Sequence, residues 1–196
     1  MRRLAAIEYV SLDGVVQAPG HAGEDPDGGF EHGGWTGAFM ADHRRYISES
    51  FQTVDAFLLG RITYELFAAV WPAVTDENDQ IAHMLNTRPK YVASATLTDP
   101  TWQGTRLLGV DVARDVTELK AQRGNRIALI GSSQLAHHLI RHDLIDEYEL
   151  YVHPVLLGRG KRLFPDDGPA TNLRVVDSRT TGSGLVILTY ERMQSH

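Results

Sequence analysis

Two short segments of the sequence combine a glycine with residue types that bind phosphate. In the first, Gly60 ends an apolar run and is followed by Arg61 and Thr63, which supply a guanidinium group and a hydroxyl. In the second, Gly131 ends another apolar run and precedes a pair of serines. A helix N-terminus has free N–H groups and a positive dipole end, and both attract phosphate. Each segment is therefore either a phosphate-binding turn or an ordinary turn between a strand and a helix.

Two phosphate-binding turns in one sheet could hold opposite ends of one dinucleotide. Neither segment is the G-x-G-x-x-G fingerprint of a Rossmann domain. The run 158–161 has the sequence Gly-Arg-Gly-Lys, but it lacks the earlier glycine and the following Ser or Thr of a Walker A motif. No glycine stands at position 135, so 131–135 is not a nucleophile elbow.

An acidic residue stands where the first predicted strand opens into a glycine-rich stretch. Asp13 could orient a substrate or relay a proton, or its carboxylate could accept hydrogen bonds from backbone amides and shape the turn. Residues 14–37 hold eight of the 18 glycines, which is typical of a lid or binding loop, or else of a disordered acidic insertion. Trp35, near the end of this stretch, is a lid anchor, a pocket wall or a core residue.

The composition excludes several classes of site. The chain has no cysteine, which excludes disulfides, thiolate zinc sites, iron–sulfur clusters and cysteine nucleophiles. His138 and His142 share one face of a predicted helix, but no third ligand and no H-E-x-x-H pattern accompany them, so we predict no metal. A formal charge of −6 disfavours phosphate backbones, so we expect no nucleic-acid partner. The first apolar run breaks at Glu8, too early for a signal peptide, and we expect a cytoplasmic protein without a membrane segment.

The 196 residues predict one domain, 1–196, with an α/β fold. Strands are expected at 4–12, 55–59, 90–94, 106–108 and 126–130, and then at 146–155, 173–178 and 185–191 without helices between them. Helices are expected at 39–51, at about 61–70, at 79–85, after an Asp111 cap and after a Ser132 or Ser133 cap. The second of these has Ile62, Leu66, Ala69 and Val70 on one face, and the inner face of the fourth is Val112, Val116 and Leu119. This pattern predicts a single mixed twisted sheet, parallel in its N-terminal part and antiparallel at its C-terminal edge, with helices on both faces.

In this order and spacing, the motifs resemble the dihydrofolate reductase-like superfamily, and within it the reductase domain of bacterial riboflavin biosynthesis, of the RibD C-terminal type. The resemblance runs from Ala6 to Tyr190. It rests on Ser11-Leu12-Asp13-Gly14, Leu59-Gly60-Arg61-x-Thr63-Tyr64-Glu65, Ile130-Gly131-Ser132-Ser133 and Val155-Leu156-Leu157-Gly158-Arg159-Gly160.

The resemblance implies NADPH as the cofactor and pairing as a homodimer. It places Arg61 at the 2′-phosphate, residues 94–96 at the adenosine ribose, and Val16 over the nicotinamide. The cofactor-binding residues that it implies are Val16, Leu59, Gly60, Arg61, Thr63, Ser94, Ala95, Thr96, Gly131, Ser132, Ser133 and Leu135.

Two positions depart from the family pattern. Dihydrofolate reductases carry an acid five residues after a tryptophan, but that position is Met40 here, with Asp42 two residues further on. The family's double glycine is Gly131-Ser132 in this chain. We therefore expect an NADPH-dependent reductase that acts on a small heterocyclic or carbonyl/imine substrate rather than on dihydrofolate. Asp13 is the candidate catalytic residue, and Trp35, Met40 and Pro154 are the candidate substrate-binding residues. The alternative is a non-catalytic nucleotide- or flavin-binding module on the same fold.

Overall fold

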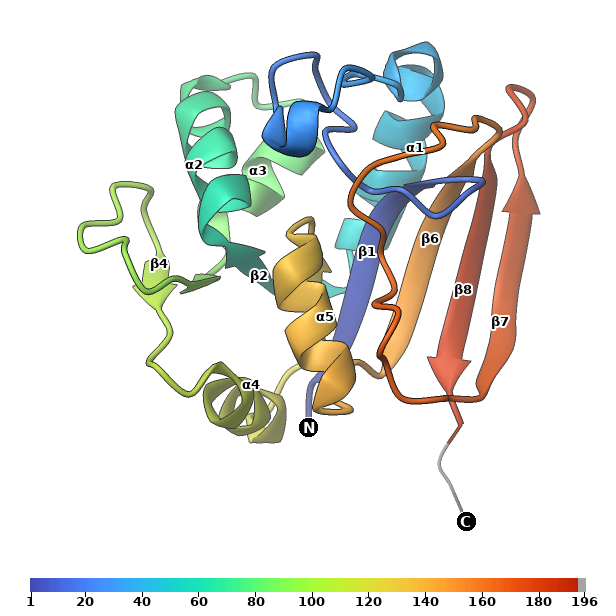
Figure 1. Ribbon diagram of the computed structural model, residues 1–196. Coiled ribbons are helices and arrows are strands. Elements are labelled where there is room, and N and C mark those ends of the chain that lie inside the picture. Colours follow the sequence, from blue (N-terminus) through green and yellow to red (C-terminus); the bar gives the residue numbers. More distant parts are fainter. Residues whose placement is uncertain (194–196) are drawn as a thin grey trace.

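An eight-stranded sheet forms the centre of the molecule (Figure 1). The computed structural model describes residues 1–193. In space the strand order is β4-β3-β2-β5-β1-β6-β8-β7. The strands are β1 (Arg3–Ser11), β2 (Val54–Gly60), β3 (Lys90–Ala93), β4 (Thr105–Leu107), β5 (Arg126–Ile130), β6 (Glu147–His153), β7 (Leu173–Thr180) and β8 (Val186–Arg192).

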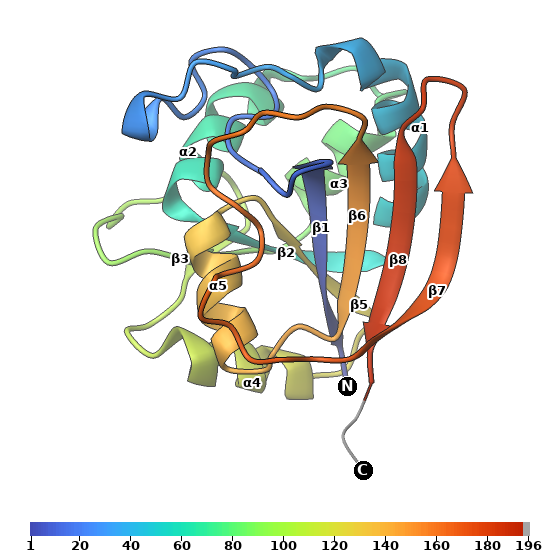
Figure 2. The ribbon, with the colours of Figure 1, turned by 45° about the vertical axis from the view of Figure 1, so that its right-hand side comes forward.

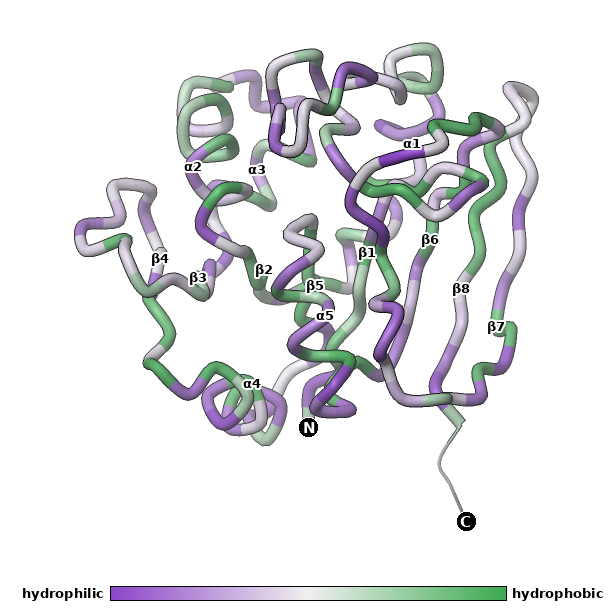
Figure 3. The backbone as a smooth tube through the Cα atoms, in the orientation of Figure 1, coloured by the Kyte–Doolittle hydropathy of each residue, from purple (hydrophilic) through white to green (hydrophobic). Residues whose placement is uncertain are grey.

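Helices cover both faces of this sheet, as predicted. Figure 2 shows α5 in front of the sheet and α1 and α3 behind it. On the α4 and α5 side, hydrophilic and hydrophobic stretches alternate along both helices, and the hydrophobic ones pack on the sheet (Figure 3). The helices are α1 (Met40–Phe51), α2 (Arg61–Val70), α3 (Gln80–Thr87), α4 (Val112–Ala121) and α5 (Ser133–Arg141), with short 3-10 turns at Asp27–Gly29, Gly37–Phe39 and Trp71–Ala73.

The direction of the strands follows from their connections. Strands β1 to β5 are joined through helices or long loops and pair in parallel, and β6 also pairs in parallel with β1. Strands β6, β8 and β7 pair antiparallel, which confirms the predicted mixed sheet. The carboxyl ends of β1, β2 and β5 therefore meet at one edge of the sheet, where α/β proteins bind their ligands.

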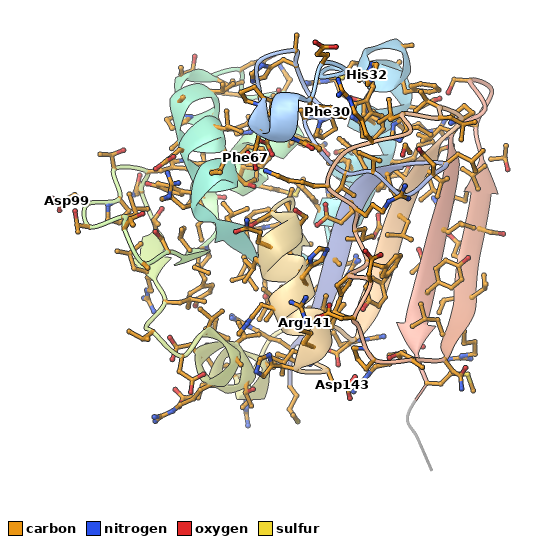
Figure 4. The ribbon with its side chains drawn as sticks, viewed as in Figure 1. Phe30, His32, Phe67, Asp99, Arg141 and Asp143 are labelled. Carbon is orange, nitrogen blue, oxygen red and sulfur yellow. The ribbon has the colours of Figure 1, made fainter. Side chains whose placement is uncertain are left out.

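Successive residues of β1 face opposite layers. Leu4 and Ala6 belong to the core under α4 and α5, whereas Ala5 and Ile7 belong to the core under α1 and α3. Both ends of the described chain lie at the end of the molecule away from the glycine-rich loop (Figure 1). Figure 4 shows the same arrangement, with Phe30 and His32 of the loop at one end of the molecule and Arg141 and Asp143 at the other.

The apolar residues predicted on one face of α2 do not pack in the core. Ile62 and Val70 are 47% and 56% exposed, and the buried residue of this helix is Tyr64, whose hydroxyl accepts a hydrogen bond from the backbone N–H of Trp102 at 3.0 Å. Ile62 and Leu66 instead line the cleft described below. Apolar periodicity alone does not distinguish a helix face that packs on a core from one that lines a cleft.

Two further observations concern the chain as far as residue 193. No helix there combines the length and the hydropathy needed to cross a bilayer. No group of three or more acidic or histidine side chains in the same range is arranged to hold a metal ion.

Candidate functional site

A cleft of about 1040 Å³ opens at the edge where β1, β2 and β5 end. This volume is at the upper end of the range for small-molecule and cofactor sites, roughly 300 to 1,000 Å³. The predicted residues that line it come from five separate parts of the chain. They are Val16, Met40, Gly60, Arg61, Thr63, Ser94, Ala95, Thr96, Gly131, Ser132, Ser133 and Leu135.

The two predicted phosphate-binding turns lie against each other. A Cβ atom added to Gly60 would lie 2.7 Å from the Cβ of Ser132, and one added to Gly131 would lie 2.8 Å from Oγ1 of Thr63. Both distances are shorter than Cβ atoms tolerate, so each glycine leaves space that a side chain of the other turn occupies. The two turns therefore form one continuous wall of the cleft.

The N-termini of α2 and α5 lack side-chain caps. The residues before them, Gly60 and Ser132, make no side-chain hydrogen bond to the first turn of either helix. The predicted capping by Ser132 or Ser133 was therefore wrong, whereas Asp111 does cap α4 through Arg114 N–H at 3.0 Å. Uncapped N–H groups at two helix N-termini in one cleft suit an anionic ligand.

Ser132 adopts a backbone conformation that favours glycine. Its φ is +60°, in the left-handed region, as is that of Gly131. The serine therefore keeps the backbone path that a double glycine would take, and its side chain lies over Gly60 instead of capping the helix.

The glycine-rich loop is ordered and fastened to the segment after β6. The Gln17 side chain accepts a hydrogen bond from Lys161 N–H at 3.0 Å and donates to the carbonyl oxygens of Asp25 and Asp27. Lys161 Nζ pairs with the Asp25 carboxylate at 2.7 Å. These bonds hold 16–20 and 24–25 along the cleft, which favours a binding loop over a disordered insertion.

Trp35 anchors this loop and does not line the cleft. Its indole N–H donates to the carbonyl oxygen of Gln17 at 2.8 Å. Its ring and that of His153 pack edge to face, with their centroids 4.9 Å apart. Pro154, another predicted substrate-binding residue, is exposed outside the cleft, and Leu59 is a fully buried core residue of β2.

Asp13 also lies outside the residues that line the cleft. Its carboxylate accepts hydrogen bonds from the Ser11 hydroxyl at 2.7 Å and from the backbone N–H groups of Leu157 and Gly158 at 3.1 and 2.7 Å. These bonds, led by that of Ser11, lower the pKa of Asp13 to about 2. The geometry corresponds to the turn-shaping interpretation of this residue.

Glu8 is a cleft residue that was not among the site residues predicted from the sequence. It is only 5% exposed, yet it lines the cleft, and its Oε2 accepts the N–H of Gly131 at 3.2 Å. Burial raises the pKa of this carboxyl to about 8, against a small lowering by the Gly131 bond. The signal in the sequence was a single acid in the middle of a buried apolar strand.

Tyr9 and His43, also missed, line the cleft from the opposite face of β1. Their rings stack at 4.2 Å, and His43 Nε2 lies 2.8 Å from His153 Nε2. His153 Nδ1 faces the Val10 carbonyl oxygen at 3.2 Å, and a carbonyl only accepts, so Nδ1 carries the proton. His153 Nε2 then accepts from His43 Nε2–H, and His43 Nδ1 keeps a lone pair without a partner among the described residues. Burial, followed by the charge of His153, lowers the pKa of His43 to about 4.

The charged groups at the cleft are mostly neutralised by neighbours. Arg61 Nη1 pairs with its helix neighbour Glu65 at 2.8 Å, and Arg44 pairs with Asp79 at 2.7 Å. The exposed i,i+4 pair of Arg61 with Glu65 contributes only about 0.3–0.5 kcal/mol, so a phosphate can displace Glu65 from Arg61.

The fold and the cleft define an α/β protein with a ligand-sized cleft at the carboxyl edge of its parallel strands. The chain belongs to the family of RibD C-terminal domains, whose family model matches residues 4–187. It is 30% identical to the uncharacterized protein YyaP of Bacillus subtilis strain 168, over 96% of this chain and 94% of that protein. It is 28% identical to the uncharacterized protein YwjB of the same organism, over 90% of each chain.

Two solved structures share the fold. One is a protein from Shewanella sp. PV-4, provisionally named a riboflavin biosynthesis protein, with a TM-score of 0.67 and 22% identity over 98% of this chain and 99% of that one. The other is a pyrimidine reductase-like protein from Corynebacterium diphtheriae, with a TM-score of 0.56 and 13% identity over 98% of this chain and 92% of that one.

Proposed function

We propose that this protein is an NADPH-dependent reductase that transfers hydride to a small heterocyclic or carbonyl/imine substrate, as riboflavin-biosynthesis-type reductases do. The observation that carries this proposal is the pair of uncapped helix N-termini, packed together on one wall of a cleft large enough for a dinucleotide. Membership of the RibD C-terminal family supports it.

The residues of the cleft fit such a cofactor. The N–H groups at the start of α2 and α5 would hold its phosphates, and Arg61 would bind the 2′-phosphate once it is released from Glu65. The turn at 94–96, where the Ser94 hydroxyl accepts the N–H groups of Thr96 and Leu97, would meet the adenosine ribose. Val16 would cover the nicotinamide.

When bound, the cofactor supplies a hydride, and the protein supplies position, charge and exclusion of water. The ordered loop 14–37 closes one side of the cleft and limits access of water to the reacting atoms.

The substrate end of the cleft differs from a pterin site. From α1 it receives Met40, His43 and Ile47 but no carboxylate, because Asp42 is bound to the Ser183 hydroxyl outside the cleft. The polar groups of α1 at the cleft are the Arg44 guanidinium, which pairs with Asp79, and His43, whose buried Nδ1 has no partner among the described residues and can accept an N–H or O–H. A small substrate with such a donor fits this end better than dihydrofolate.

The test is to titrate NADPH and NADH separately and follow nicotinamide fluorescence. We expect NADPH to bind at sub-millimolar concentration and more tightly than NADH. If neither nucleotide binds in this range, the proposed function is wrong. A screen of NADPH oxidation against pterins, pyrimidines, aldehydes and quinones then identifies the substrate class.

One observation favours the non-catalytic alternative, a module that holds another nucleotide or a flavin. The N–H of Gly131, which could bind a ligand, is already taken by Glu8. Mass spectrometry of ligands released from the purified protein separates the two functions, because a retained ligand without nicotinamide would indicate the module.

A further inference from the structure

Glu8 combines deep burial with an incomplete set of hydrogen bonds. It is 5% exposed, and one carboxyl oxygen, Oε2, is held by the N–H of Gly131 at 3.2 Å. The other, Oε1, is buried and has no partner among the described residues. Buried polar groups in proteins are nearly always satisfied, so an orphaned carboxyl oxygen in the wall of a cleft indicates a role toward a ligand.

Within residues 1–193, no cationic side chain pairs with Glu8. Only burial and the Gly131 bond shift its pKa, which rises to about 8, so the carboxyl holds its proton at neutral pH. The cationic side chains that line the same cleft pair with other carboxylates: Arg44 with Asp79, Arg61 with Glu65, and Lys161 with Asp25. The titratable groups around the cleft are Tyr9 on the opposite face of β1, Glu24, Asp25 and Lys161 in the loops, His43 and Arg44 on α1, Arg61 on α2 and His138 on α5.

The position of Glu8 relates it to the nicotinamide end of the cleft. It bonds directly to the turn that begins α5. Its neighbours on the same face of β1, Ala6 and Val10, belong to the core cluster against which Val16 packs. Val16 and the 131–135 turn are the residues between which the nicotinamide ring would lie under the proposed function.

We propose that Glu8 is the proton donor of this site and that its protonation is coupled to the charge of the bound nicotinamide ring. This inference rests on the proposed function. Reduction of a C=N or C=O bond places the hydride on carbon and one proton on nitrogen or oxygen. The Glu8 carboxyl gives that proton, and its carboxylate regains one from water after the product leaves.

The coupling follows from electrostatics. The reduced ring is neutral, so Glu8 stays protonated beside it, whereas the oxidised ring carries one positive charge. An opposite charge within about 4–6 Å lowers the pKa of a carboxyl by roughly 1–3 units. NADP+ should therefore release a proton from Glu8 on binding, and NADPH should not.

The experiment counts protons by titration calorimetry at about pH 7 in two buffers of different ionisation enthalpy. Both nucleotides carry the same 2′-phosphate, so the difference between them isolates the ring. From a starting pKa of about 8, we expect NADP+ to release about 0.4–0.9 more proton than NADPH. Glu8→Gln should abolish this difference. Glu24→Gln, the same change at a loop carboxylate of the same cleft, should keep it.

Two results would overturn the inference while leaving the proposed function intact: both nucleotides bind without a difference in proton release, or the difference persists in Glu8→Gln. Failure of both nucleotides to bind would remove the proposed function and the inference together. If Glu8→Gln does not fold, the coupling can still be tested on the unaltered protein by measuring how the affinities for the two nucleotides depend on pH. Its Kd for NADP+ relative to that for NADPH should tighten by about 10- to 450-fold between about pH 5 and pH 9, and a constant ratio refutes the coupling.

Discussion

Replacing Glu8 by Gln should stabilise the folded protein increasingly as the pH rises. The carboxyl has a pKa of about 8 in the fold and 4.5 as its ordinary value, so the folded state holds one more proton than the unfolded chain between these values. Stability then falls by about 1.4 kcal/mol for each pH unit in that window. Glutamine keeps the shape and the acceptor for the Gly131 N–H but carries no charge. The variant should gain on the order of 3 kcal/mol over the natural protein at about pH 7, and about 5 kcal/mol above pH 8.

The assay is urea unfolding of both proteins at several values between about pH 5 and pH 9. The two free energies of unfolding should differ by less than about 1 kcal/mol near pH 5, diverge up to about pH 8, and keep a constant difference above it. Glu191→Gln should show the opposite pH dependence. The hydrogen bond from Arg3 lowers the pKa of Glu191, so losing this carboxylate should destabilise the protein at neutral pH and have a smaller effect in acid. A difference between Glu8→Gln and the natural protein that does not change with pH would show that folding does not raise the pKa of Glu8.

Three other predictions test the walls of the cleft. Gly60→Ala should cost about 1–3 kcal/mol of unfolding free energy by forcing the two turns apart, whereas Gly37→Ala, with open space at its Cβ, should cost far less; equal losses in denaturant unfolding would contradict the packing. Arg61→Ala should weaken NADPH binding more than NADH binding in fluorescence titrations, and an equal loss would remove this residue from the 2′-phosphate. His43 should stay neutral down to about pH 5, because burial lowers its pKa to about 4, and burial also lowers the pKa of His153, whose proton lies on Nδ1, so stability falls as the pH drops from about 6.5 toward 4; nitrogen NMR showing titration of His43 near pH 6.5 would contradict this.

Local patterns were sufficient to predict the fold. Strands β1, β2 and β5 are mostly apolar runs that end at or directly before a serine or glycine, and such runs are typical of buried parallel strands. The loss of helices after α5 predicted the antiparallel edge. The apolar face of α2 could be predicted from its periodicity, but its position at the cleft could not, because a cleft and a core both accept apolar side chains.

The two turns could be found in the sequence because each carries its chemistry within a few consecutive residues. Their mutual packing could not be found, since it depends on the register that places Leu59 beside Ile130. Asp13 shows the same limit, because its partners at 157 and 158 lie some 144 positions away in the chain.

Glu8, by contrast, was visible as an acid that interrupts an apolar strand, but its significance depends on burial. A carboxylate at that position could have pointed to solvent at the edge of a sheet. Only the central place of β1, between β5 and β6 and beneath the turn at Gly131, makes it a buried acid in the wall of the cleft.

The central claim is that the turns at 60–63 and 131–135 hold one pyridine nucleotide between them. A crystal structure of the protein with NADP+ tests it most directly. We predict density for the pyrophosphate against the N-termini of α2 and α5, with the ring between Val16 and the turn that Glu8 contacts. A nucleotide bound elsewhere, with both turns free of ligand, would contradict the account.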